Sequence, residues 1–279
     1  LLVGIGLLLV GLAFKVSAVP FHSWAPDVYE GAPSPVTAFM ASAGKVAAFA
    51  AILRVLTIAL ERRVDDWRPV IWVLALLTVF VGSIMAVVQT NVKRMLAFSS
   101  VTHAGFVLVG VEAAAHAGSN GLASSLTYLL LYTVLVIGSF AVVFVVAGRG
   151  DGATSLEDFA GLARRRPVLA LAFTVLLLAQ AGVPFTSGFI AKFGVIKSAV
   201  EVHSYAIAIA AMVAAVIGAF LYLRIMVSMW LNDPSDPAPL DVPLAAGVVI
   251  AFAIAFTLFV GVFPGWLLDA ARNIDLFRN

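Results

Sequence analysis

The sequence AGVPFTSGFIAKF at residues 181–193 places a proline, two hydroxyl side chains and a lysine inside an apolar stretch that runs from residue 168 to residue 200. A helix that crosses a membrane needs about 20 mostly apolar residues, so this stretch is too long for one straight span. Pro184 also removes a backbone hydrogen-bond donor near its centre. The stretch therefore predicts two half-helices that are separated by a break.

The pentapeptide VPFTS at residues 183–187 of this stretch has a near copy at the start of the chain. The copy is VPFHS at residues 19–23, and it differs from VPFTS in one residue. Lys15 lies beside the first copy, as Lys192 lies beside the second. Counting the apolar segments places the copies five crossings apart, so they run through the membrane in opposite directions. Broken helices in inverted repeats are common in transporters. We therefore expect inverted five-helix repeats with two discontinuous helices, broken at Pro20 and Pro184.

The composition predicts the class of the whole chain. Hydrophobic residues make up 62% of it and charged residues only 11%, whereas a soluble domain carries about a quarter charged residues. We predict an all-α polytopic membrane protein, surrounded by the lipid bilayer, with about eight transmembrane helices. The expected spans are residues 1–29 (broken), 36–60, 70–89, 95–115, 122–147, 168–200 (broken), 204–231 and 243–266.

Charge and cysteine content exclude several functions. The net charge of +2 suggests no nucleic-acid partner. The chain has no cysteine, which excludes thiolate-ligated iron–sulfur clusters and disulfides within it. Its four histidines do not have the spacing of a metal site, so we expect no metal and no cofactor bound by this chain.

Three lysines, Lys15, Lys45 and Lys192, lie deep in apolar sequence. Lys45 follows Val36 by nine residues, which places it about 14 Å into the membrane at 1.5 Å per residue, near the midplane. A central lysine costs about 3 kcal/mol on insertion scales, and no acidic residue lies at that depth in any span. An unpaired ammonium there either loses its proton or faces hydrated protein interior, and both suit a group that exchanges protons.

Other polar residues are weaker candidates. His103 in SSVTHAGF is the one histidine well inside a span, and it is either a further proton relay or a structural residue. Tyr128 and Tyr132 could order water beside it. Lys93 and Arg94 belong to the short sequence TNVKR, which we predict to be a basic turn at the membrane interface.

Three blocks of sequence carry a family resemblance: FKVSAVPFHSWAPDVYEGAPSPVTAFMASAGK at 14–45, NVKRMLAFSSVTHAGFVLVG at 91–110 and AGVPFTSGFIAKF at 181–193. Together they resemble the antiporter-like subunits of respiratory complex I, the proton-pumping NADH-quinone oxidoreductase. A lysine at residue 192, where the M branch usually has glutamate, and the absence of lysine from segment 122–147 favour the N branch of this family. The resemblance covers nearly the whole chain in order.

The resemblance implies a position within a larger fold of fourteen spanning helices. This chain corresponds to helices seven to fourteen, and it opens LLVGIGLLLVGLAF without a methionine, so we expect that an N-terminal part is missing. Residues 1–60 would end the first inverted repeat, residues 61–231 would form the second five-helix repeat, and residues 232–279 would hold a loop, the final transmembrane helix and a C-terminal tail. The glutamate that the family pairs with the position of Lys15 belongs to a helix outside this chain.

The resemblance also implies a function. Lys15, Lys45 and Lys192 would relay protons along a hydrated axis, coupled to redox chemistry in other subunits of the complex, which would hold NADH, FMN, iron–sulfur clusters and quinone. The partners would be other membrane subunits of complex I, including neighbouring antiporter-like subunits, in a bacterial inner membrane. Two alternatives remain open: a subunit of a multisubunit sodium/proton antiporter, and a structural membrane subunit whose lysines form ion pairs.

Overall fold

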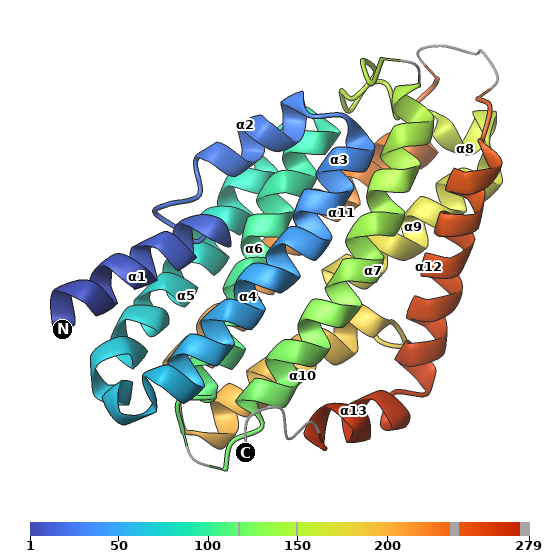
Figure 1. Cartoon of the computed structure of the whole chain (residues 1–279). Coiled ribbons are helices and arrows are strands. Elements are labelled where there is room, and N and C mark those ends of the chain that lie inside the picture. The colour runs from blue at the N-terminus through green and yellow to red at the C-terminus, as the bar shows by residue number, and fades with distance from the viewer. Residues whose placement is uncertain (117, 149, 235–239, 274–279) are drawn as a thin grey trace.

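The computed structural model describes residues 1–116, 118–148, 150–234 and 240–273, and these residues form a bundle of helices joined by short connections (Figure 1). The helices are α1 Leu2–Lys15, α2 Trp24–Gly31, α3 Ser34–Phe39, α4 Lys45–Arg54, α5 Val64–Val87, α6 Val92–Ala113, α7 Gly121–Ala147, α8 Leu162–Arg165, α9 Pro167–Ala181, α10 Ser187–Glu201, α11 Tyr205–Leu231, α12 Leu244–Val262 and α13 Gly265–Arg272.

Six continuous helical segments in the described part of the chain are long and apolar enough to cross a membrane. One of them runs from Ser34 to Ala59, because π-helical turns at Met40–Gly44 and Val55–Ala59 join and extend α3 and α4. The pairs α1–α2 and α9–α10 form two further segments, each interrupted near its middle. The predicted all-α polytopic fold with two discontinuous helices is confirmed.

Helix α6 lies at the centre of the bundle, and every residue from Met95 to Ala113 is buried. It packs against α2, α5, α7, α10 and α11. Its contact with α5 is close because two glycines allow it: a Cβ atom on Gly82 or on Gly105 would lie 2.7 Å from an atom of the facing helix. Small residues at such crossings let membrane helices approach each other. Polar side chains on α6 are therefore surrounded by protein.

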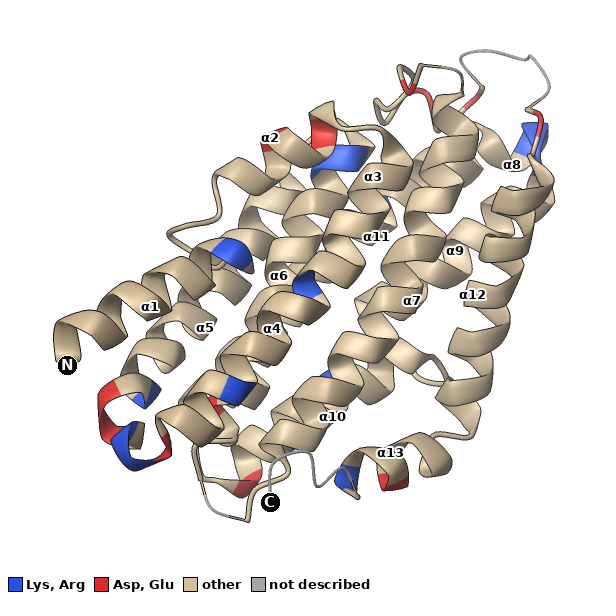
Figure 2. Cartoon of the chain, in the orientation of Figure 1, with Lys and Arg blue, Asp and Glu red and all other residues tan. Residues whose placement is uncertain are grey.

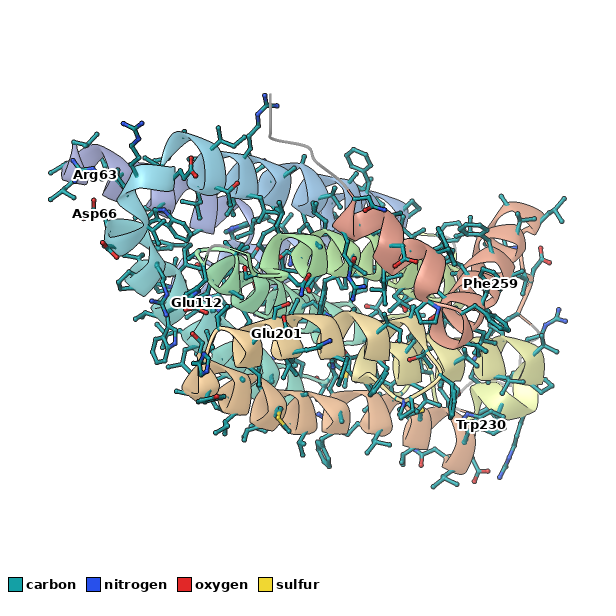
Figure 3. The ribbon with its side chains drawn as sticks, turned by 90° about the horizontal axis from the view of Figure 1, so that it is seen from below. Arg63, Asp66, Glu112, Glu201, Trp230 and Phe259 are labelled. Carbon is teal, nitrogen blue, oxygen red and sulfur yellow. The ribbon has the colours of Figure 1, made fainter. Side chains whose placement is uncertain are left out.

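Charged residues gather at the two ends of the bundle, and a few basic positions lie partway along it (Figure 2). We call the end that holds the α2–α3 junction and residues 150–161 the loop end, and the end that holds residues 113–116 and 118–121 the opposite end. Side chains fill the space between the helices, with Phe259 and Trp230 on the side away from Arg63 and Asp66 (Figure 3).

Two predicted features lie partly outside the described residues. The loop expected to begin at residue 232 includes residues 235–239, and the C-terminal tail includes residues 274–279. The final transmembrane helix before that tail is α12, and the short helix α13 follows it.

Candidate functional site

The break between α9 and α10 holds the second pentapeptide. Helix α9 ends at Ala181, and Gly182 turns the chain in the left-handed region at φ 91°, where glycine pays no side-chain penalty. Helix α10 then begins at Ser187. The Ser187 N–H donates to the Thr257 hydroxyl of α12 at 3.2 Å, and the two hydroxyl oxygens lie 2.6 Å apart. A side chain of a neighbouring helix thus satisfies backbone that the break exposes.

The first pentapeptide is held in the same manner. Helix α1 ends at Lys15 and α2 begins at Trp24. Between them the Val19 N–H donates to the Thr78 hydroxyl of α5 at 3.0 Å. In both breaks the threonine belongs to the second spanning segment further along the chain. This parallel is what a repeat of five spanning segments predicts.

Lys192 lies on α10, one turn beyond the second break. It is 8% exposed, and its Nζ donates to the Ala181 carbonyl oxygen, the last of α9, at 2.8 Å. The same nitrogen lies 5.0 Å from the ring centroid of Phe106 on α6, within cation–π range. The broken helix therefore supplies a free carbonyl that receives the lysine of its own second half.

Lys45 directly follows the π-helical turn Met40–Gly44. It is 3% exposed, and its Nζ donates to the Ser100 carbonyl oxygen of α6 at 2.5 Å. Among the described residues neither Lys45 nor Lys192 forms an ion pair with an acidic side chain. Single-turn π-helical insertions are frequent at functional sites, and this one shapes the turn that leads into Lys45.

His103 lies on α6 between Ser100, whose carbonyl oxygen accepts Lys45, and Phe106, whose ring Lys192 contacts. Its Nδ1 is 2.6 Å from the Tyr128 hydroxyl of α7, and its Nε2 is 3.1 Å from the Tyr222 hydroxyl of α11. Tyr222 also lies 2.6 Å from the Ser99 hydroxyl, and the Tyr132 ring centroid is 4.7 Å from that of His103. A buried hydrogen-bonded cluster therefore lies between the positions of Lys45 and Lys192.

Lys15 does not join this cluster in the chain as described. Its side chain is exposed at the end of α1, and it makes no hydrogen bond or ion pair with the described residues. Pro20 and Pro184 both fall in the non-helical connections between half-helices. The structure thus brings together Lys45, His103 and Lys192 and leaves Lys15 at the surface.

The prediction that Lys93 is a loop charge at the interface is wrong. Lys93 lies in the first turn of α6 and is 1% exposed. Its Nζ is 2.5 Å from Asp151 and 2.6 Å from the Ala32 carbonyl oxygen. Arg94, by contrast, is partly exposed and pairs with Asp27 and Glu30 of α2.

The sequence did not reveal four of the residues that complete the site: Ser99, Tyr222, Thr78 and Thr257. A tyrosine in an apolar span is a weak signal, and Tyr222 in AFLYLRIM gives one. Its partner cannot be deduced from the sequence, because Tyr222 and His103 are 119 positions apart.

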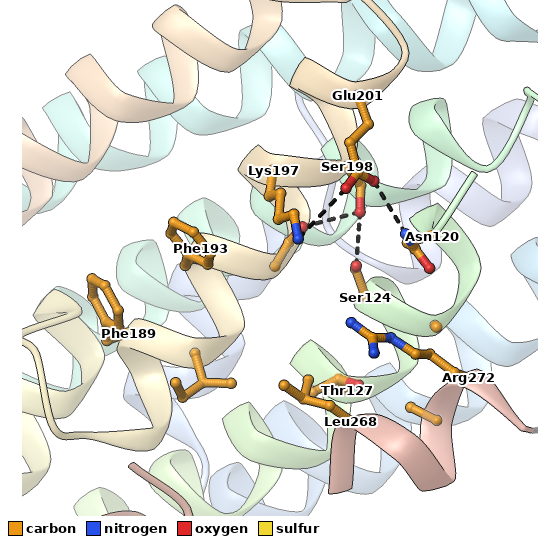
Figure 4. A pocket seen from close by; sticks show the side chains of 14 residues that line it. Asn120, Ser124, Thr127, Phe189, Phe193, Lys197, Ser198, Glu201, Leu268 and Arg272 are labelled. Carbon is orange, nitrogen blue, oxygen red and sulfur yellow. Dashed lines mark hydrogen bonds and ion pairs between the residues drawn. The ribbon is translucent and has the colours of Figure 1, made fainter. Parts of the chain in front are cut away.

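A cavity of about 260 Å³ opens at the opposite end between α7, α10 and α13 (Figure 4). Lys197 and Glu201 pair across one turn at 3.6 Å, and Ser124 and Ser198 share a hydrogen bond of 2.8 Å. Thr127 also lines the cavity, and its buried hydroxyl has no hydrogen-bond partner among the described residues. The described part of the chain contains no group of His, Cys, Asp or Glu residues that could hold a metal ion.

Comparison with known families gives one match over most of the chain. Residues 1–218 match the family described as NADH:quinone oxidoreductase/Mrp antiporter, TM. The chain is similar to NADH-quinone oxidoreductase subunit N 3 of Streptomyces griseus, at 47% identity over 99% of this chain and 50% of the relative. It is 48% identical to NADH-quinone oxidoreductase subunit N of Rhodococcus opacus, over 99% of this chain and 51% of the relative. The chain thus spans about half the length of the relatives it matches.

Solved structures give the same fold. A chain of respiratory complex I from Thermus thermophilus with bound aureothin superposes with a TM-score of 0.80 and 32% identity, over 97% of this chain and 59% of that one. A chain of the Mrp complex from a Dietzia species superposes with a TM-score of 0.86 and 25% identity, over 96% of this chain and 58% of that one.

Proposed function

Because this chain belongs to the NADH:quinone oxidoreductase/Mrp antiporter transmembrane family, we propose that it is the proton-translocating part of a complex I membrane subunit. Its relay consists of Lys45, His103 and Lys192, with Lys15 as a further member in the full-length subunit. The chain itself carries out no redox step. NADH, FMN, iron–sulfur clusters and quinone belong to other subunits of the assembly.

The observation that carries this proposal is the burial of two lysines without acidic partners. Lys45 and Lys192 each donate to a backbone carbonyl, and neither forms an ion pair with a described acidic residue. A static structural lysine would be stabilised by a carboxylate, since a central lysine costs about 3 kcal/mol in a membrane. Lysine, unlike arginine, readily changes its protonation state when it is buried. The pair is therefore suited to exchange protons.

The cluster around His103 supplies the connection between the two lysines. An imidazole can accept a proton on one ring nitrogen and release one from the other. His103 has a hydroxyl partner on each ring nitrogen, Tyr128 and Tyr222. A proton that leaves the Lys45 ammonium can reach a neutral Lys192 amine through this histidine and intervening water. Lys45 is then a neutral amine and Lys192 an ammonium.

The two threonine-held breaks support the proposed division of the chain into residues 1–60, 61–231 and 232–279. The two broken helices make the same kind of contact with a threonine, and they lie five spanning segments apart along the chain. The proposed setting is the inner membrane of a bacterium, as a multi-pass subunit beside other antiporter-like membrane subunits of the complex.

A second candidate function is that of a subunit in a sodium/proton antiporter complex. The superposition on the Dietzia Mrp chain favours it, although the identity of 25% to that chain is lower than the 47–48% to the subunit N relatives. Copurification separates the two: flavin- and cluster-bearing partners support complex I, and their absence from an intact assembly supports the antiporter.

The experiment that tests the relay is alanine substitution in the assembled complex. Lys45→Ala and Lys192→Ala are expected to lower the number of protons pumped per electron while the complex still forms. Unchanged pumping by both variants contradicts the relay. Loss of assembly supports the structural alternative, in which the lysines only hold helices together.

A further inference from the structure

The buried charge of Lys93 has no role in the relay described so far. It lies in the first turn of α6, where the helix dipole disfavours a cation, and it is almost wholly buried. The stability of α6 therefore does not account for this lysine. Its partner Asp151 lies 58 positions further along the chain, in the loop at 150–161.

Asp151 is held firmly in place by three donors. One carboxylate oxygen accepts the Lys93 ammonium at 2.5 Å and the Ser34 N–H at 2.9 Å, and the other accepts the Ser34 hydroxyl at 2.6 Å. The residue adopts a left-handed φ of 57°, which is uncommon for a residue other than glycine. The loop is thus turned so that this carboxylate points at the ends of α3 and α6.

Asp151 connects this buried pair to the outside. Its side chain is 17% exposed whereas that of Lys93 is 2% exposed. It lines a cleft of about 660 Å³ at the loop end, together with Ser34, the C-terminal end of α7 and the segment that leads into α12. The carboxylate therefore faces the cleft on one side and the buried ammonium on the other.

Polar groups continue inward from Lys93 towards Lys45. Ser100 lies seven residues after Lys93, which is nearly two helical turns, so both face the same side of α6. The Ser100 carbonyl oxygen accepts the Lys45 ammonium. Neither Ser100 Oγ nor Tyr132 Oη, both buried, has a hydrogen-bond partner among the described residues. Buried polar atoms of this kind are sites for ordered water.

We propose that Asp151 and Lys93 form the proton-exchange site at the loop end of the relay, connecting the cleft to Lys45 past Ser100. This inference rests on the proposed function, and it adds a connection between the lysine relay and one side of the membrane. In the resting pair Lys93 is an ammonium and Asp151 a carboxylate. When an N–H bond of Lys93 breaks and the proton moves inward to water or to neutral Lys45, Asp151 takes a proton from water in the cleft. That proton then moves from the Asp151 carboxyl to the Lys93 amine, which restores the pair.

The test uses the full-length subunit in its assembled complex in sealed membrane vesicles, with proton pumping measured per NADH oxidised. Lys93→Arg keeps the positive charge and the ion pair, but arginine does not release its proton. Asp151→Asn keeps the shape of the side chain and one of the two oxygen acceptors that Ser34 uses, but its amide cannot carry a proton. Lys93→Arg keeps its counterion and is expected to assemble normally, whereas Asp151→Asn leaves the buried Lys93 charge without one and is expected to lower the amount of assembled complex. Per assembled complex, both variants are expected to show a several-fold loss of pumping.

The matched control is Asp158→Asn in the same loop. Asp158 accepts the N–H and the hydroxyl of Ser155, both at 2.7 Å, much as Asp151 accepts those of Ser34. Among the residues that the structure describes, it forms no hydrogen bond or ion pair with a buried lysine. It is expected to pump as the unmodified complex does. Asp151→Glu, which restores a carboxylate, is expected to recover part of the pumping.

The outcomes separate this inference from the relay itself. If Lys93→Arg and Asp151→Asn pump as Asp158→Asn does while Lys45→Ala does not pump, the loop-end site is wrong and the relay stands. If Lys45→Ala also pumps normally, the proposed function fails. If neither Lys93→Arg nor Asp151→Asn assembles, the pair is a structural clasp for the loop, and the assignment is overturned.

Discussion

A single added methyl group at Gly182 is predicted to disturb the relay through Lys192. In Gly182→Ala the new Cβ would lie 2.9 Å from Lys192 Cδ, so the lysine side chain has to move by about half an ångström to reach an ordinary contact. Movement directly away from the break lengthens its 2.8 Å hydrogen bond to the Ala181 carbonyl beyond the usual range for such bonds.

The size of the effect follows from two contributions. A hydrogen bond to a charged group contributes about 1.5–3 kcal/mol, and losing half of the upper value corresponds to roughly a tenfold change in rate. The left-handed backbone of residue 182 adds about 1–2 kcal/mol of strain for alanine, which affects stability but not the lysine directly. We expect the complex to assemble and to pump protons about tenfold more slowly, as measured in vesicles by a pH-sensitive dye.

The control for this prediction is Gly118→Ala. Gly118 also has a positive φ of 75°, but a Cβ there would meet no atom within 4 Å. The variant therefore has comparable backbone strain without the contact to Lys192. Equal pumping by Gly182→Ala and Gly118→Ala would refute the reasoning, because strain alone would then account for any change.

Three further substitutions test the contacts that surround the relay. Thr257→Val leaves the backbone N–H that begins α10 unpaired, at about 1–3 kcal/mol, and should lower the thermal unfolding midpoint of the complex. Tyr222→Phe removes the hydroxyl that links His103 to α11 and should reduce pumping several-fold with assembly intact. Arg68→Ala leaves the fully buried Glu112 without its ion-pair partner, a loss of about 3–5 kcal/mol, and should lower the amount of assembled complex.

Each of these has a matched substitution. Thr133 bonds only to a carbonyl of its own helix, so an equal loss of stability in Thr133→Val contradicts the role of Thr257. Tyr205 is exposed, so equal pumping by Tyr205→Phe and Tyr222→Phe contradicts the role of the latter. Glu112→Gln removes the buried charge itself, and it should be tolerated better than Arg68→Ala; the reverse order contradicts the ion-pair argument.

The spans and both breaks could be predicted from the sequence because they depend on local properties. Apolar length sets the spans, and proline marks the breaks. The expected segment 168–200 accordingly divides into α9 and α10 around Gly182 and Pro184. Sequence reasoning could also select Lys45 and Lys192, since a charged residue in the middle of an apolar span is costly. That cost can be recognised without knowing which residues surround the lysine in the fold.

The partners of these residues could not be predicted, because they depend on tertiary packing. The sequence TNVKR predicts that Lys93 is a turn residue. Only the folded chain places Asp151 beside it, in an ion pair in which the Lys93 side chain is buried. Nothing in the sequence predicts the π-helical turn before Lys45 either.

The central claim is that Lys45 and Lys192 exchange protons and do not serve merely as fixed charges. Arginine substitution tests this most directly, because arginine keeps the charge and the donors but holds its proton. Proton pumping per electron should be measured for Lys45→Arg and Lys192→Arg in complexes that assemble at the normal level, beside Lys197→Arg on the exposed face of α10. The account predicts loss of pumping in the first two and normal pumping in the third; normal pumping in all three would contradict it.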